Sequence, residues 1–214
     1  MRSITELRGK HAGEDIWVLA AGPSAEYVEP EFFNGKVLVG VNRVWVKFDP
    51  DYVVIKEGQV VTQAALAGWP IIASKYHCGA NNYALNEAPG EVYIFEHEHN
   101  HLEKVDLDVI GTDKIVVSYS TITSALHVAA YMGAANIILV GHDCGFLDGQ
   151  RNFEDYPEPI ATTPGFYEQF LEKIEPQTLA VKQRLWEVYG CRTYSLNPFI
   201  NFGLEGHTYE RSLS

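Results

Sequence analysis

Short runs of apolar residues recur along this chain, and glycine, asparagine, proline or charged residues end them, which predicts strands. The runs cover residues 16–20, 36–41, 52–55, 70–74, 92–95, 114–117, 137–140 and 192–196. Most are apolar without alternation, as expected of a parallel sheet that is buried on both faces. Helical patterns lie between several of them, at 25–28, 60–67, 121–132 and 166–189, the last with an expected break at Pro176.

The stretch 118–146 carries the clearest of these patterns, a predicted helix followed by a buried strand. Ser120 or Thr121 can cap the start of the helix, because a side-chain oxygen there accepts a hydrogen bond from a free backbone N–H. Gly133 stands where a left-handed residue should end the helix. The run 137–140 then reads as a strand whose carboxyl end leads into a polar loop.

The order of the elements decides the fold class. Strands that alternate with helices predict a Rossmann-like, doubly wound α/β fold with a mainly parallel sheet and helices on both faces. At 214 residues the chain is expected to form a single domain, 1–214. Residues 147–165 show no periodicity, so we expect a lid-like insertion over 144–176.

Composition narrows the functional classes. A net charge of −12 argues against non-specific binding of nucleic acid, which needs a basic face. Cys78, Cys144 and Cys191 are too far apart for a CxxC zinc site and odd in number, which favours a reducing, cytoplasmic location. The chain contains no apolar run long enough for a transmembrane helix, and its first residues are too polar for a signal peptide.

Polar residues follow the predicted strands at their carboxyl ends, where ligands bind in open α/β sheets. Gly22-Pro23-Ser24 would form a tight turn that brings backbone N–H groups close to a phosphate. A simple capped turn is the alternative interpretation of this motif. The other candidates on this edge are Asn42, Lys56, Ser120, Thr121, His142 and Asp143. Together they predict a nucleotide or nucleotide-sugar site.

Other known site motifs are missing from the sequence. It has no GxGxxG, no GxxxxGK[ST] and no GxSxG, which excludes a standard dinucleotide site, a P-loop and a nucleophile elbow. His97, His99 and His101 would share one face of an extended strand and could hold a metal. Because no fourth ligand is evident, we favour a polar loop there and predict no metal site.

The sequence blocks VLAAGPSAEYV, VGVNRV, FDPDYVVI, TITSALHVAAYMGAANIILVGHDCGF and TYSLNP resemble the bacterial family-42 sialyltransferases. They are also similar to the wider MptE-like group, named for a 6-hydroxymethylpterin pyrophosphokinase. The resemblance runs over residues 16–200, except 76–112. It implies a Rossmann-like domain with a mobile lid, metal-independent transfer and a homo-oligomer.

The resemblance also implies roles for individual residues. It assigns donor binding to the Gly22-Pro23-Ser24 turn and to Asn42, and it puts Ser120 and Thr121 near the transferred sugar. Asp143 matches the aspartate of the family's G-x-D strand end. The chain departs from the family at several positions. Ala21 and Lys56 stand where the family has asparagines, and the two lid tyrosines fall near Gly145 and Arg151. Lys173 aligns with the lid histidine.

Replacements within the chain are conceivable for these missing groups. Arg151 can hold the leaving phosphate, since a guanidinium binds phosphate, and Tyr156 lies close in sequence. His142 is our candidate for the general base, with a bracing role in the loop as the alternative. Catalytic roles are therefore predicted for His142, Asp143 and Arg151.

Three functions remain after this comparison. The first is a sialyltransferase-like glycosyltransferase that needs no cofactor and passes the sugar of a nucleotide donor, for instance a CMP-linked sugar, to a hydroxyl acceptor. The second is pyrophosphoryl transfer from ATP, which would require Mg²⁺ held by Asp143 and by Glu57 or Asp148. The third is a nucleotide-binding module without catalysis. Metal dependence would separate the first two.

Overall fold

A parallel sheet of eight strands forms the centre of the computed structural model, which describes residues 1–56, 58–78, 89–97, 105–157, 166–196 and 208–209. Every ladder between these strands is parallel. The order across the sheet is β1 (Arg2–Ser3), β6 (Val92–Phe95), β5 (Ile71–Ser74), β4 (Tyr52–Ile55), β3 (Val37–Val41), β2 (Asp15–Leu19), β7 (Asn136–Val140) and β9 (Arg192–Ser195).

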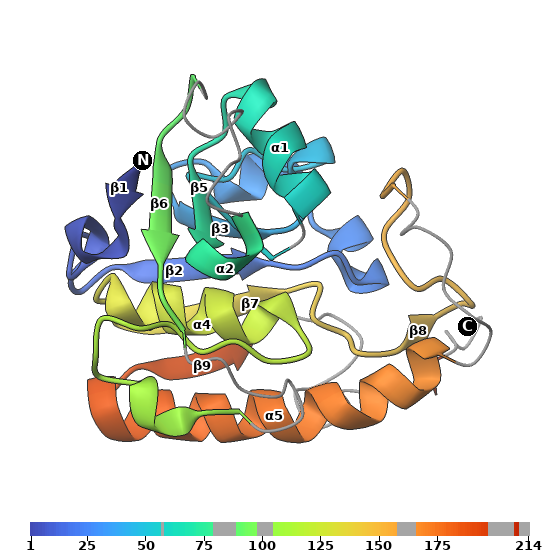
Figure 1. Cartoon of the computed structure of the whole chain (residues 1–214). Helices are drawn as coiled ribbons and strands as arrows, with labels where there is room; N and C mark the ends of the chain where they lie inside the picture. Colours follow the sequence, from blue (N-terminus) through green and yellow to red (C-terminus); the bar gives the residue numbers. More distant parts are fainter. Residues whose placement is uncertain (57, 79–88, 98–104, 158–165, 197–207, 210–214) are drawn as a thin grey trace.

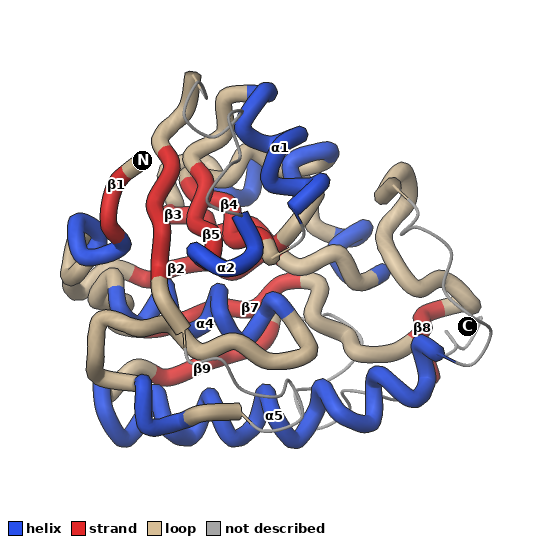
Figure 2. Tube along the Cα trace, viewed as in Figure 1, coloured by secondary structure: helices blue, strands red, loops and turns tan. Residues whose placement is uncertain are grey.

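Helices cover both faces of this sheet (Figures 1 and 2). On one face α4 (Thr121–Tyr131) lies on β2, β3, β4 and β7, and α5 (Phe166–Tyr189) packs against α4 and β9. Because strand side chains alternate, Val54 joins this core while Val53 joins a second core beneath α1 (Gly58–Ala67). The remaining short elements are η1 (Ile4–Leu7), η2 (Pro23–Tyr27), η3 (Pro30–Phe33), η4 (Val44–Val46), α2 (Lys75–Cys78), η5 (Leu107–Val109), β8 (Phe146–Leu147) and β10 (Thr208–Tyr209).

The strand order reverses at β2. From β2 the chain builds the sheet outward through β3, β4, β5 and β6, and it then crosses to the other side of β2 to form β7 and β9. In open α/β sheets, the crevice outside the carboxyl ends of the strands at such a reversal binds ligands. A ligand site is therefore expected at the carboxyl ends of β2 and β7.

The structure confirms the predicted fold class and most of the predicted elements. Each apolar run except one forms a strand within one residue of its expected bounds. Gly133 has a φ of 92° and ends α4 as expected. Only glycine fits at this position, because an added Cβ would lie 2.9 Å from the Cα of Ala12. The short helix expected at 25–28 is the 3-10 helix η2 and begins earlier, at Pro23.

The prediction of a strand at 114–117 is wrong. Its backbone bonds to side chains of α4 instead of a neighbouring strand: Val116 N–H donates to His127 Nδ1 (3.1 Å), and Ser124 Oγ donates to Val116 O (2.7 Å). An isolated bridge between Glu96 and Lys114 is what remains of strand pairing here. The segment is buried and mostly apolar, as a central strand would be. Its hydrogen-bond partner is a helix, however, and not another strand.

The predicted helix break at Pro176 is also wrong, because α5 continues through this residue. Pro176 lies on the exposed side of the helix, where water can bind the carbonyl group that loses its N–H partner. On the opposite side Ile174, Thr178 and Val181 are buried. The packed face thus runs past Pro176 without interruption, and the end of the lid-like insertion from 166 to 176 is helical.

Candidate functional site

Two glycines allow the turns after β2 and β7 to touch at the reversal point. Gly22 N–H donates to the carbonyl oxygen of Gly141 (2.7 Å), and a Cβ at Gly22 would overlap that oxygen and lie 2.5 Å from Asp143 Oδ2. Gly141 has a φ of 68°, and a Cβ there would lie 2.8 Å from the Cβ of Ala25. The Gly22-Pro23-Ser24 turn and the loop that carries His142 and Asp143 are therefore in direct contact.

Ser24 and Asp143 bind each other inside this contact. Asp143 Oδ2 accepts a hydrogen bond from the Ser24 backbone N–H (2.7 Å), and Oδ1 accepts one from Ser24 Oγ (2.5 Å). Both residues are buried. Burial raises the pKa of the Asp143 carboxyl, and the two hydrogen bonds from Ser24 oppose part of that rise. The geometry makes this pair a brace that holds the Gly22-Pro23-Ser24 turn against β7.

Asn42 follows β3 in a conformation that residues other than glycine rarely adopt. Its φ is 55°, and its N–H donates to the carbonyl oxygen of Val54 (3.1 Å), which extends the ladder to β4. The carboxamide oxygen Oδ1 is buried and has no hydrogen-bond partner among the residues that the structure describes. A buried unpaired acceptor costs about 1–3 kcal/mol. Strain and an unpaired polar group at one position are typical of functional sites.

Lys56, Ser120 and Thr121 belong to a third cluster, where β4 meets the start of α4. Lys56 Nζ donates to the carbonyl oxygens of Ser118 (2.5 Å) and Tyr119 (3.1 Å), so its charge fixes the turn before the helix. Ser120 is the N-cap of α4, as predicted, and its Oγ accepts from the Ile122 N–H (3.3 Å). Thr121 is buried in the first turn. The structure thus brings these three residues together.

His142 lies half-buried at the exit of β7, with its Nε2 3.4 Å from the Sγ of Cys144. Burial lowers the pKa of the imidazole to about 3, and the positive charge of Lys182 contributes to this shift. A general base works best with a pKa near the working pH, because it must hold the proton that it removes. The imidazole of His142 is neutral at pH 7 but weakly basic, a poor match to the base that we expected.

Arg151 and Tyr156 flank an anchored aromatic residue. Phe153 is buried between Phe48 and Tyr156, with ring centroids 6.1 and 5.3 Å away, and its N–H donates to the carbonyl oxygen of Ala21 (3.1 Å). Arg151 and Tyr156, both half-buried, are thereby held beside the turn that follows β2. The first part of the lid-like insertion contacts the site, as the lid hypothesis requires.

A cavity of about 310 Å³ adjoins this part of the site, between η2 and residues 147–154. Its walls include the acidic residues Glu26, Asp148 and Glu154. Glu26 pairs with Lys47, at 3.0 Å between Oε1 and Nζ. These walls are unsuited to a phosphate, so we expect an anionic group to bind on the other side of the turn, toward α4 and α5.

Among the three histidines of the possible metal site, the structure describes His97. Its Nδ1 makes a hydrogen bond of 2.8 Å with Ser74 Oγ, which also accepts the N–H of Tyr76 (3.1 Å). His99 and His101 lie outside the described residues, as does Glu57, a suggested Mg²⁺ ligand. Within the described part of the chain no three His, Cys, Asp or Glu side chains gather as metal ligands would.

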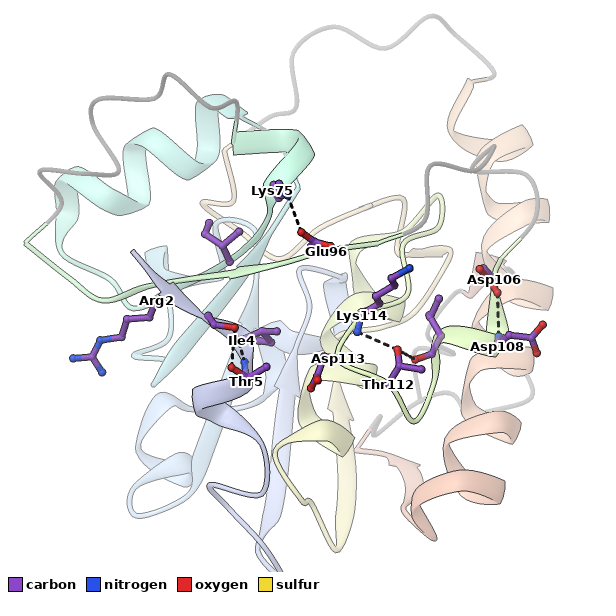
Figure 3. A pocket seen from close by; sticks show the side chains of 13 residues that line it. Arg2, Ile4, Thr5, Lys75, Glu96, Asp106, Asp108, Thr112, Asp113 and Lys114 are labelled. Carbon is purple, nitrogen blue, oxygen red and sulfur yellow. Dashed lines mark hydrogen bonds and ion pairs between the residues drawn. The ribbon is translucent and has the colours of Figure 1, made fainter.

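A larger cavity of about 740 Å³ lies near the ends of β5 and β6, on the same edge of the sheet (Figure 3). Several of its charged residues already have partners in the chain. Lys75 Nζ lies 2.7 Å from Glu96 Oε1, and Asp113 accepts from the hydroxyl of Tyr131 (2.5 Å) and pairs with Arg8. We therefore assign no ligand to this cavity.

The sequence interpretation missed two polar residues that α5 buries against the site. Gln177 Oε1 accepts the N–H of Tyr119 (3.2 Å), next to the start of α4. Lys182 is 9% exposed and close enough for its charge to act on His142. Their spacing within the apolar stripe of α5 is a signal that could have identified both, because a charged residue is rare on such a face.

Comparison with known proteins gives few relatives. No family model and no curated protein matches the sequence. Among solved structures, the sialyltransferase CstII from Campylobacter jejuni, in complex with the substrate analogue cytidine-5'-monophosphate, aligns with 92% of this chain and 85% of its own, at 12% identity and a TM-score of 0.49. A Cst-II variant in complex with CMP aligns with 86% and 82%, at 13% identity and a TM-score of 0.48. Likeness at this level carries no argument about activity.

The described residues contain no helix that is both long and apolar enough to cross a membrane.

Proposed function

We propose that this chain binds a nucleotide-activated sugar outside the carboxyl ends of β2, β3 and β7 and transfers the sugar to a hydroxyl acceptor. The observation that carries the proposal is Asn42, whose buried carboxamide oxygen has no partner in the described part of the chain. A carboxamide can recognise a base or a ribose because it offers both a donor and an acceptor. Asn42 stands on the strand next to β2, where the strand order reverses.

Different segments of the chain would bind different parts of the donor. The Gly22-Pro23-Ser24 turn, held by Asp143, would present backbone to the donor. The α4 start, which Lys56 fixes through Ser118, would orient the sugar. The first lid residues would then cover the nucleotide from the side of Phe153, which is anchored to Ala21. These assignments follow from where each group is rigidly held.

The pyrophosphokinase alternative gains no support from the geometry of its proposed metal ligand. Both carboxylate oxygens of Asp143 already accept hydrogen bonds from Ser24, so Mg²⁺ would have to share them, and the described residues hold no cluster of further ligands. The alternative keeps a direct test: if ATP with Mg²⁺ stabilises the chain while CMP, CDP, UDP and GDP do not, our proposal is wrong.

The sharpest test replaces Asn42 by glycine. Glycine adopts a φ of 55° without strain, and the change removes the unpaired acceptor, so the melting temperature should stay the same or rise. Nucleotide binding should fall by about tenfold or more, since one hydrogen bond to a buried group contributes roughly 1–2 kcal/mol.

Binding is measured by thermal shift, because a ligand of the folded state alone raises the melting temperature. The panel is CMP, CDP, UDP, GDP and ATP, each with Mg²⁺ and with EDTA. Asn34→Gly is the matched control, since Asn34 is exposed and ends η3 away from the site. No shift with any nucleotide would contradict the proposal. If CMP raises the melting temperature but the chain does not turn over a CMP-linked sugar, the hypothesis of a non-catalytic nucleotide-binding module remains.

A further inference from the structure

The two edges of the sheet differ in how they are protected against pairing with another chain. β1 forms one edge with two residues, and its Arg2 pairs with Glu91 at 2.8 Å. Short strands and charged side chains are common devices against edge-to-edge pairing. β9 forms the other edge with four residues, and no described residue pairs with its outer side. The edge at β9 can therefore accept a further strand.

The backbone hydrogen bonds of β9 show which of its polar groups face outward. Leu196 N–H donates to the carbonyl oxygen of Leu139 in β7 (2.8 Å). Because the N–H and C=O groups of successive residues in a strand point to opposite sides, those of Tyr194 also face β7, while those of Thr193 and Ser195 face away from the sheet. The edge thus presents backbone donors and acceptors that the described part of the chain does not bind.

The side chains around this edge are those of an interface rather than of a protected edge. Thr193 Oγ1 is buried and has no hydrogen-bond partner among the described residues. Trp186 and Tyr194 are 44% and 48% exposed, and the guanidinium carbon of Arg192 lies 4.8 Å from the centre of the Trp186 ring. Leu179, which is 46% exposed, lies two turns before Trp186 on the same side of α5. Exposed apolar side chains beside an open edge indicate a protein partner.

The charge of this region favours a second copy of the chain as that partner. A net charge of −12 makes copies of the chain repel one another in general. Residues 184–196 carry two arginines and one glutamate, a net charge of +1, so two copies can approach here without that repulsion. Arg192 and Tyr194 are also complementary to each other, since they lie on the same face of β9 and a guanidinium binds the face of an aromatic ring.

We propose that β9 pairs antiparallel with β9 of a second copy, around a two-fold axis at Thr193. The two Thr193 residues would exchange both backbone hydrogen bonds, because each presents its N–H and C=O groups outward. Their hydroxyls would lie opposite each other and could bond after a rotation about χ1, which gives Thr193 Oγ1 the partner that it lacks. In this register Arg192 of each copy lies opposite Tyr194 of the other. This inference is independent of the proposed function.

The same arrangement would bury the exposed side of α5. A two-fold axis perpendicular to the sheet keeps the α5 helices of both copies on one face of the joined sheet, and α5 packs against β9 in each copy (Figure 1). Leu179 and Trp186 would then cover the junction between the two sheets, with Trp186 beside the pair of Arg192 and Tyr194. One symmetric contact thus accounts for the open edge, the unpaired hydroxyl and the exposed apolar side chains.

Analytical ultracentrifugation of the full chain tests this interface. The wild type should sediment as a dimer, at twice the 24.0 kDa of the chain, and dilution gives its dissociation constant. Tyr194→Lys places a positive charge opposite Arg192 at two symmetric positions, where like charges are destabilising, so the dissociation constant should rise about tenfold or more. The double variant Arg192→Glu, Tyr194→Lys puts opposite charges at both positions and should dimerise again.

Tyr76→Lys is the matched control, because Tyr76 is 43% exposed on α2, which contacts β5 and is separated from β9 by β4, β3, β2 and β7. It should leave the dissociation constant unchanged. Three results would overturn the inference: equal losses in the two lysine variants, no loss in Tyr194→Lys, or a double variant that stays monomeric. A wild type that is still monomeric at about 1 mM would also overturn it and leave the edge to a strand of another protein.

A second measurement, hydrogen exchange followed by NMR, needs no variant. In a monomer the outward amide protons of Thr193 and Ser195 have no acceptor among the described residues and should exchange rapidly. In the dimer both are hydrogen-bonded, so their exchange should slow as the concentration rises above the dissociation constant. Exchange that does not depend on concentration contradicts the inference. None of these measurements involves a nucleotide, so their failure would leave the proposed function intact.

Discussion

The contact between Ser24 and Asp143 gives a residue-scale prediction about how the site is held together. Removing either side chain breaks a buried hydrogen bond between the two residues, at a cost of about 1–3 kcal/mol in unfolding free energy. Removing both should cost less than the sum, with a coupling of at least about 1 kcal/mol. Urea unfolding of Ser24→Ala, Asp143→Ala and the double variant measures this coupling. Additive losses would show that the two residues do not act as a pair.

At this scale the sequence predicted the position of the polar groups better than their partners. Gly22, Ser24 and Asp143 were expected at one edge of the sheet because parallel strands end together, and they lie there. Their mutual bond could not be predicted, since a hydroxyl and a carboxylate are as suited to a ligand as to each other. The pKa of His142 likewise depends in part on the charge of Lys182 in α5, far along the chain.

At the scale of elements, α4 takes the role of a strand for the segment 114–117. Ser124 and His127 lie about one turn apart on α4, and their side chains bond to the carbonyl and N–H groups of Val116. Periodicity identified this segment as buried but could not distinguish a neighbouring strand from polar side chains on a helix. The other apolar runs were correctly predicted as strands because each pairs with a parallel strand of the same buried sheet.

Ser124→Ala tests this arrangement. The variant leaves the carbonyl group of Val116 buried without its donor, so the unfolding free energy should fall by about 1–3 kcal/mol. Thr62→Ala is the matched control: Thr62 makes a similar bond to the carbonyl oxygen of Gly58 (3.2 Å), but on an exposed turn of α1 where water can replace it. Equal losses in the two variants would contradict the proposed role of Ser124.

For the whole molecule, the alternation of strands and helices was enough to predict the architecture. The predictable part rests on rules of chirality and burial that hold for any parallel sheet. The conformation of residues 147–157 was not predictable, because they follow no periodicity and are fixed by particular contacts, such as that of Phe153 with Ala21. The burial of Lys182 on α5 could be recognised only from the packing of the helix.

The last prediction concerns stability as a function of pH. Burial lowers the pKa of both His127 and His142 to about 3, against about 6.5 in the unfolded chain. The unfolded state therefore binds more protons between these values, and stability should be lost as the pH falls from 6.5 toward 3. Each histidine contributes a slope of about 1.4 kcal/mol per pH unit.

Two effects oppose this loss. Acidification toward the isoelectric point near 5.0 reduces the repulsion within a chain of net charge −12, and the raised pKa of Asp143 favours the folded state at low pH. Repulsion between exposed charges is largely screened at physiological salt, whereas the buried His127 and the half-buried His142 together contribute up to about 2.7 kcal/mol per pH unit. Urea midpoints should therefore fall between pH 6.5 and 4.5. His142→Gln should halve the slope that the histidines add, and an unchanged slope would show that His142 is not buried as a neutral group.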